Sequence, residues 1–135
     1  MSRENGAQQP RVRVALVGHC GPDQWALRSA VNSALPGVEF LSINVQSTLS
    51  SSLPSIDIAL VNRVLDGRFE SDSGIGLIGR LASAPTPRPA LMLISNFADA
   101  QQQAEAAGAI PGFGKSDANS DLARQRLQHA AGVNA

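Results

Sequence analysis

Three polar side chains in this sequence each come directly after a short apolar run. Asn62 follows the run IALV, Ser95 follows ALMLI, and Lys115 follows IPGFG. Short apolar runs that end at a polar residue are typical of parallel strands buried on both faces of a sheet. Functional sites of open α/β sheets lie beyond the carboxyl ends of such strands. We therefore expect Asn62 at the centre of a site that also contains Ser95 and Lys115.

An amide, a hydroxyl and an ammonium group in one place permit two roles. In the first, they form a hydrogen-bonded cluster that holds the strand ends together. In the second, they line a pocket for a small anion, with Lys115 and the N-terminus of a helix as donors. In either case we expect the Lys115 ammonium near the Asn62 side-chain oxygen or near Ser95, because a buried charge without a partner is costly.

The turn Gly18-His19-Cys20-Gly21 brings two metal-binding residue types next to each other. Zinc requires three or four ligands, and the other histidine, His129, lies far along the chain. The turn also lacks the third glycine and the acidic residue of a dinucleotide-binding motif. We therefore expect a turn histidine and a buried or half-buried thiol, with no metal and no cofactor.

Strand-like and helix-like segments alternate five times around these residues. Strands are expected at 11–17, 38–44, 56–62, 90–95 and 110–114. Helices are expected at 22–35, 47–52, 74–84, 99–107 and from Asn119 or Ser120 to 131. Five such units predict a three-layer α/β sandwich of the flavodoxin-like (βα)5 type, with parallel strands in the order 2-1-3-4-5 and the first and last helices on one face. In that order the first and third strands are neighbours, which places Gly18 and His19 beside Asn62.

Capping and periodicity give further expectations for single residues. Ser73 is expected to cap the third helix. Trp25 lies off the apolar stripe of the first helix and is expected to be partly exposed. The helical spacing predicts that the inner face of the last helix consists of Leu122, Ala123, Leu127, Ala130 and Ala131.

Length and charge narrow the function classes. The chain has 135 residues, which suits one domain, and its 11 basic and 11 acidic residues give a net charge of zero. No basic stripe favours nucleic acid, and no apolar run reaches the roughly 20 residues of a membrane span. One cysteine excludes an internal disulfide and fits a reducing, cytoplasmic compartment. We expect a domain over 11–131, between a disordered lead-in at 1–10 and a frayed C-terminus at 132–135.

In its order of elements from Arg11 onwards, the sequence resembles the receiver domain of bacterial response regulators. Ser95 matches the hydroxyl residue that ends the fourth strand in that family. Lys115 matches the lysine that ends the fifth strand, behind a helix and the segment Ala107-Gly108-Ala109. The resemblance implies a module of two-component, phosphorelay signal transduction.

Other positions depart from the family pattern. The family has two acidic residues after the first strand, where this sequence has Gly18 and His19, and a phosphoacceptor aspartate where it has Asn62. Gly112 lies near the place of an aromatic switch residue, which Phe113 partly replaces. An aspartyl nucleophile needs a carboxylate, and magnesium prefers carboxylate oxygens. We therefore expect a pseudo-receiver that is not phosphorylated on Asn62, binds magnesium weakly and is not an enzyme.

The resemblance also implies where such a module meets its partner, an unidentified signalling protein. The usual docking face of the family is the fourth helix, fifth strand and fifth helix. Here that face consists of Gln101, Gln102, Glu105, Phe113, Arg124 and Gln128. A homodimer is left open. With so few residues after the last helix, we expect no DNA-binding or catalytic output domain.

Two other functions remain open. One is a small-ligand or anion sensor that uses the pocket around Asn62. The other is phosphotransfer at a displaced acceptor such as Asp66, on the loop after the third strand. Mass measurement after incubation with a phosphodonor distinguishes the second of these from the rest.

Overall fold

The computed structural model describes residues 11–84 and 88–133 of the chain. The predicted lead-in at 1–10, residues 85–87 between the third helix and fourth strand, and residues 134–135 lie outside this part. Its strands are β1 (Arg13–Val17), β2 (Glu39–Ile43), β3 (Ile58–Asn62), β4 (Ala90–Ile94) and β5 (Ile110–Phe113). Its helices are α1 (Gly21–Ala34), α2 (Gln46–Ser52), α3 (Gly74–Ala82), α4 (Ala98–Ala107) and α5 (Asp121–Val133), with short 3-10 turns η1 (Leu53–Ser55) and η2 (Lys115–Asp117). Each predicted strand and helix is present, with its ends within two residues of those predicted.

The strands of the described residues form a parallel sheet in the order β2-β1-β3-β4-β5. This confirms the predicted topology. Val17 at the end of β1 is level with Ile43 on one side and with Val61 on the other. Asn62 at the end of β3 is level with Ile94 on β4. The carboxyl ends of these strands therefore share one edge of the sheet, where the loops that follow them meet.

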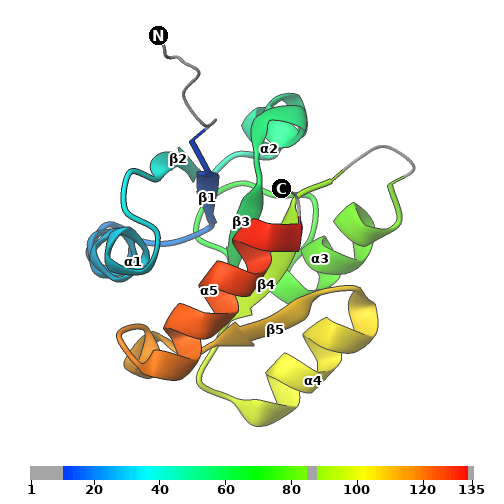
Figure 1. Ribbon diagram of the computed structural model, residues 1–135. Helices are drawn as coiled ribbons and strands as arrows, with labels where there is room; N and C mark the ends of the chain where they lie inside the picture. Colours follow the sequence, from blue (N-terminus) through cyan, green and yellow to red (C-terminus); the bar gives the residue numbers. More distant parts are fainter. Residues whose placement is uncertain (1–10, 85–87, 134–135) are drawn as a thin grey trace, which may run out of the picture.

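Helices cover both faces of the sheet (Figure 1). The helices α1 and α5 pack on one face, through buried side chains such as Leu27 and Leu127. The helices α2, α3 and α4 pack on the other, through Leu49, Ile78 and Ala104. The first and last helices share a face, as predicted. Because both faces are covered, the central strands β3 and β4 are buried along their whole length and are apolar up to Asn62 at the end of β3.

The predicted cap at Ser73 is confirmed, and of the two candidates Asn119 and Ser120 it is Ser120 that caps the last helix. The Ser73 hydroxyl oxygen accepts a hydrogen bond from the backbone N–H of Gly76 at 3.1 Å, at the start of α3. The Ser120 hydroxyl oxygen accepts one from the N–H of Ala123 at 3.1 Å, at the start of α5. Each cap satisfies one of the donors that the first turn of a helix leaves free.

Two large apolar side chains are more exposed to solvent than predicted. Leu122 is 51% exposed, and its place on the inner face of α5 was wrong. One residue along a helix is a rotation of about 100°, so Leu122 turns away from the sheet when its neighbour Ala123 is buried. Trp25 is 76% exposed, well beyond partial exposure. Within the described residues, no helix combines the length and apolar character needed to cross a membrane.

Candidate functional site

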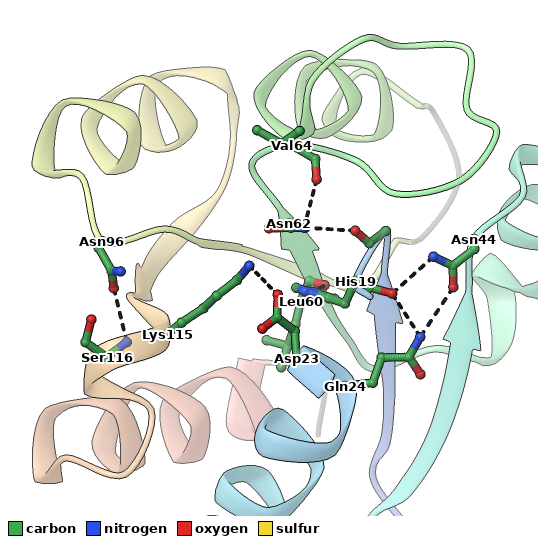
Figure 2. A network of polar contacts seen from close by, with 11 residues as sticks. His19, Asp23, Gln24, Asn44, Leu60, Asn62, Val64, Asn96, Lys115 and Ser116 are labelled. Carbon is green, nitrogen blue, oxygen red and sulfur yellow. Dashed lines mark hydrogen bonds and ion pairs between the residues drawn. The ribbon is translucent and has the colours of Figure 1, made fainter. Parts of the chain in front are cut away.

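Asn62 joins the end of β1 to the loop that follows β3. Its side chain is about nine-tenths buried, and its Nδ2 donates hydrogen bonds to two backbone carbonyl oxygens. One is the oxygen of Gly18 at 2.9 Å and the other that of Val64 at 2.7 Å (Figure 2). An ionised carboxylate only accepts hydrogen bonds, so an aspartate could not make either contact. The amide is required here for its two N–H donors.

The loop between β3 and α3 lies across the end of β1. The Asp66 backbone N–H donates to the Gly18 oxygen at 2.9 Å, and the Asn44 side-chain nitrogen donates to the Asp66 carbonyl at 2.6 Å. Gly18 has φ +75°, and a Cβ there would lie 2.7 Å from the Leu65 side chain. Glycine is therefore needed at position 18 both for its backbone conformation and for space. The Asp66 side chain itself is exposed.

His19 is enclosed behind this loop. It is 1% exposed, and its Nε2 lies 2.8 Å from the Leu60 carbonyl oxygen, which makes Nε2–H the donor. Its Nδ1 is buried and has no hydrogen-bond partner among the described residues. Its backbone carbonyl accepts from the Gln24 and Asn44 side chains at 3.0 and 3.2 Å (Figure 2). The loss of hydration on burial lowers the pKa of His19 from 6.5 to about 4, only partly opposed by the bond to Leu60.

The neighbouring Cys20 differs from its prediction. A buried or half-buried thiol was expected, but Cys20 is exposed. It occupies the N-cap position of α1, at the surface. His19 and Cys20 therefore face different environments, as expected for adjacent residues in a turn.

Lys115 forms an ion pair that the sequence analysis missed. Its Nζ lies 2.6 Å from the Asp23 carboxylate oxygen (Figure 2). Within the described residues its hydrogen bond goes to Asp23 and not to Asn62 or Ser95, although all three side chains line one hollow. The hydrogen bond from Lys115 holds the pKa of Asp23 below its ordinary value. Asp23 lies in the first turn of α1, where a negative charge is also favourable to the helix dipole.

The ends of β3, β4 and β5 surround a shallow hollow, here called the strand-end hollow. The described residues that line it are Asn62, Arg63, Val64, Ile94, Ser95, Asn96, Phe97 and Lys115. The structure thus brings Asn62, Ser95 and Lys115 to one place. Gly18 and His19 contact Asn62 or its strand from the β1 side and do not line the hollow.

Ser95 and Asn96 organise the backbone at the rim of this hollow. Ser95 is buried, and its hydroxyl oxygen accepts from the Phe97 backbone N–H at 3.2 Å. The Asn96 side-chain oxygen accepts from the Ser116 N–H at 3.1 Å (Figure 2). The end of β4 is thereby tied to the start of α4 and to η2.

Two residues of the predicted docking face, Gln101 and Phe113, are engaged in contacts within the fold. Gln101 donates to the carbonyl oxygens of Leu93 and Ser95 at 2.9 and 3.1 Å, and its Oε1 accepts from the Gly112 N–H at 3.3 Å. Phe113 is 3% exposed, because it packs under α5 in the core. A Cβ at position 112 would lie 2.1 Å from the Leu93 carbonyl oxygen. Gln101 and Phe113 therefore offer little surface to a partner, and an aromatic side chain at Gly112 would not fit.

The rest of that predicted face is divided between two sides of the sheet. Gln102 and Glu105 are exposed on α4. Arg124 and Gln128 donate instead to backbone carbonyls of α1, at 3.3 and 3.4 Å. Arg124 and Gln128 therefore lie on the side of α5 that faces α1.

The donors at the strand ends do not suit a magnesium ion. The Gly18 carbonyl already accepts two hydrogen bonds, His19 Nδ1 is enclosed, and the Asp23 carboxylate is neutralised by Lys115. Magnesium prefers carboxylate oxygens in an octahedral arrangement. In residues 11–84 and 88–133, no three histidine, cysteine, aspartate or glutamate residues are grouped closely enough to hold a metal ion.

Comparison with solved structures identifies the architecture. The response regulatory domain of protein mrkE from Klebsiella pneumoniae matches with a TM-score of 0.70 and 16% identity, over 90% of this chain and 97% of that one. A response regulator from Thermotoga maritima matches with a TM-score of 0.66 and 18% identity, over 91% and 99% of the two chains. A CheY-like receiver domain from Methylobacillus flagellatus gives 0.68 and 12%, over 90% and 99%.

The chain has the receiver fold. No protein-family model matches the sequence, and no curated protein matches it. At identities of 12–18%, the likeness to receivers establishes the fold alone. The function has to be argued from the residues at the strand ends of this receiver fold.

Proposed function

We propose that this chain is a pseudo-receiver, a signalling module that acts through contacts with a protein partner and does not accept a phosphoryl group at position 62. The observation that carries the proposal is the use of the Asn62 amide. Both of its N–H groups are committed to backbone carbonyls of the surrounding loops. The residue at the end of β3 therefore has a structural task that the acceptor aspartate of the family could not perform.

The chemistry of the remaining groups supports the same conclusion. A neutral amide oxygen is a poor nucleophile compared with a carboxylate. The carboxylate nearest to Lys115, that of Asp23, is held in an ion pair on α1. The family's acidic pair is replaced by Gly18, which has no side chain, and by His19, which is buried and neutral at pH 7. None of these groups supplies what aspartyl phosphorylation requires.

A signalling role without an enzymatic step agrees with the receiver fold and with a chain of zero net charge. The partner is proposed to be a signalling protein, and nucleic acid is not favoured. The exposed single cysteine suits a reducing compartment, which we take to be the cytoplasm.

Intact-mass measurement tests the proposal. The chain is incubated with acetyl phosphate and magnesium, beside a receiver that has the acceptor aspartate as the positive control. We expect the control to gain a phosphoryl group and this chain to keep its mass. A stoichiometric adduct would contradict the proposal, and peptide mapping would then show whether the exposed Asp66 is a displaced acceptor.

A second candidate function is the sensing of a small anion in the strand-end hollow. It is favoured by the presence of Arg63 and Lys115 among the lining residues and by the lack of an acidic side chain among those described. Calorimetric titration with phosphate and sulfate tests it. Binding that is lost in Lys115→Met would favour the sensor.

A further inference from the structure

Two exposed apolar side chains stand together at the carboxyl edge of the sheet. Phe97, at the start of α4, is 59% exposed, and Val64, after β3, is 61% exposed. Both line the strand-end hollow. The loops that carry them leave neighbouring strands at the same level, since Asn62 on β3 pairs with Ile94 on β4. Exposed apolar groups at the rim of a hollow favour contact with another molecule.

The charge of this hollow differs from that of the whole chain. Arg63 and Lys115 line it, and no aspartate or glutamate is among the described lining residues, although the chain as a whole is neutral. The Arg63 guanidinium lies over the Phe97 ring, 5.1 Å from its centroid, and pairs with no carboxylate in the described part of the chain. Stacking on the ring leaves the edge of the guanidinium, with its N–H donors, free to bind a carboxylate.

The Lys115 ammonium has N–H donors left for an acceptor other than Asp23. Its ammonium has three N–H groups, and one described carboxylate, that of Asp23, contacts it. Ser95 adds a hydroxyl whose oxygen accepts from Phe97 N–H, so its hydrogen is available to a ligand. The strand-end hollow therefore presents donors from three side chains beside an apolar rim.

A second hollow continues from the first along α4. It shares Arg63, Asn96 and Phe97 with the strand-end hollow and adds Ile75, Ala98, Asp99, Ala100 and Gln103. Phe97 thus lines both depressions. The second depression contains Asp99 as well as Arg63, so it favours an acidic group less than the strand-end hollow does, whereas an apolar side chain could pack on Ile75 and the small residues of α4.

We propose that this surface binds a segment of a partner protein in which an acidic side chain is adjacent to a large apolar side chain. The carboxylate lies in the strand-end hollow between Arg63 and Lys115, and the apolar side chain packs on Phe97 and Val64. This inference rests on the proposed function, since it names the surface and the partner chemistry through which the module signals. It replaces the face on α4, β5 and α5, where Phe113 is buried and the Gln101 side chain is hydrogen-bonded to the backbone.

Selection from a library of random dodecapeptides displayed on phage tests this inference. The full chain is immobilised, and enriched peptides are synthesised with a fluorophore and measured by anisotropy. We expect the enriched peptides to share an aspartate or glutamate next to leucine, isoleucine, valine, methionine or phenylalanine. Their affinity should fall at least tenfold in Arg63→Ala and in Phe97→Ala, and should weaken as salt is raised.

Matched controls come from a second stacked pair elsewhere on the molecule. Arg28 lies over the Phe40 ring at 5.3 Å, on the α1 side of the sheet, and Trp25 is an exposed aromatic residue on α1. Arg28→Ala and Trp25→Ala should bind the peptides as the unaltered chain does. Thermal melting verifies that each variant is folded. If Arg63→Ala or Phe97→Ala does not fold, Arg63→Gln or Phe97→Ser is measured in its place.

Several outcomes would overturn the inference. One is that no peptide is enriched, or that enriched peptides have no acidic residue. Another is that Arg124→Ala abolishes binding while Arg63→Ala does not, which would move docking to α5 and leave the proposed function intact. A third is that inorganic phosphate binds as tightly as the peptides and Phe97→Ala has no effect, which would make the hollow an anion site. Phosphorylation in the mass measurement would instead contradict the proposed function and leave the peptide result unaffected.

Discussion

The Asn62 side-chain nitrogen lies 2.9 Å from the carbonyl oxygen of Gly18, across the two neighbouring strands β1 and β3. The same nitrogen donates to the Val64 carbonyl oxygen at 2.7 Å. Both acceptors are backbone atoms, so their positions are set by the fold and not by a mobile side chain. The identity of residue 62 is thereby tied to the stability of the loops at the strand ends.

Restoring the acceptor residue of the receiver family should therefore weaken this fold. In Asn62→Asp, two hydrogen bonds are lost and a carboxylate oxygen faces two carbonyl oxygens in a nearly buried place. We expect a loss of about 1–3 kcal/mol in the free energy of unfolding, measured by urea denaturation at pH 7.

Asn96→Asp is the matched control for that change. The Asn96 side chain uses its oxygen to accept from Ser116 N–H, and a carboxylate can accept in the same way. We expect its free energy of unfolding to change by less than that of Asn62→Asp. Equal effects of the two substitutions would contradict the assigned role of the Asn62 N–H groups.

Gly18→Asp, which restores one acidic residue of the family, should also destabilise the fold. The positive φ of Gly18 and the contact of an added Cβ with Leu65 would cost about 1–3 kcal/mol. Gly21→Asp is the control, because nothing lies within 4 Å of a Cβ at that position. If Gly18→Asp were as stable as Gly21→Asp, the loop after β3 would not be packed closely against Gly18, and the assigned contact would be wrong.

His19 should make the fold sensitive to moderate acid. Its pKa is 6.5 when hydrated and about 4 in the folded chain, so the unfolded chain binds more protons between these two values. The stability that His19 provides is complete above pH 6.5 and falls as the pH is lowered towards 4. The full loss amounts to about 3 kcal/mol, measurable by urea denaturation at a series of pH values.

Two histidine variants separate this effect from general acid denaturation. His19→Gln should lose most of the slope between pH 6.5 and 4, while His129→Gln, on the exposed side of α5, should keep it. A slope that persists in His19→Gln would contradict the assignment. NMR titration of the His19 ring gives the same answer directly, with a midpoint near pH 4 expected.

The ion pair of Lys115 with Asp23 should contribute little to stability, because each side chain is about one-third exposed. We expect Lys115→Met to cost about 0.5–1 kcal/mol. The same variant should raise the pKa of Asp23, since its main cause of depression is removed. The stability linked to Asp23 is lost only as the pH falls below 3.8, outside the range assigned to His19. An unchanged Asp23 carboxyl titration in Lys115→Met, followed by NMR, would contradict the pair.

The topology was predictable because the strand signal is local. Apolar runs that end at a polar residue define the carboxyl edge, and the alternation of elements then fixes which side chains can meet. Asn62, Ser95 and Lys115 were found in this way. The helix caps at Ser73 and Ser120 could also be predicted from the sequence, because a cap depends on a few neighbouring residues.

Contacts across the edge were not predictable in the same way. The partner of Lys115 is Asp23, more than ninety residues earlier on a helix, and the sequence shows Asp23 only as an acidic residue in a first helical turn. The positive φ of Gly18 and the burial of His19 depend on the loop after β3, whose path over β1 has no sequence signal. Phe113 and Gln101 were assigned to the docking surface because the resemblance indicates which elements form that surface. It does not indicate which of their side chains are exposed.

Amide NMR of the uniformly labelled chain, with and without magnesium and beryllofluoride, tests the central claim most directly. The Asn62 side-chain NH2 group is the probe, because both of its hydrogens are assigned to carbonyl acceptors. We predict that its two resonances exchange slowly with solvent and do not move when magnesium and beryllofluoride are added. Saturable shifts of the Asn62 side chain together with Ser95 and Lys115 would show that a phosphoryl mimic occupies the site, and would contradict the account.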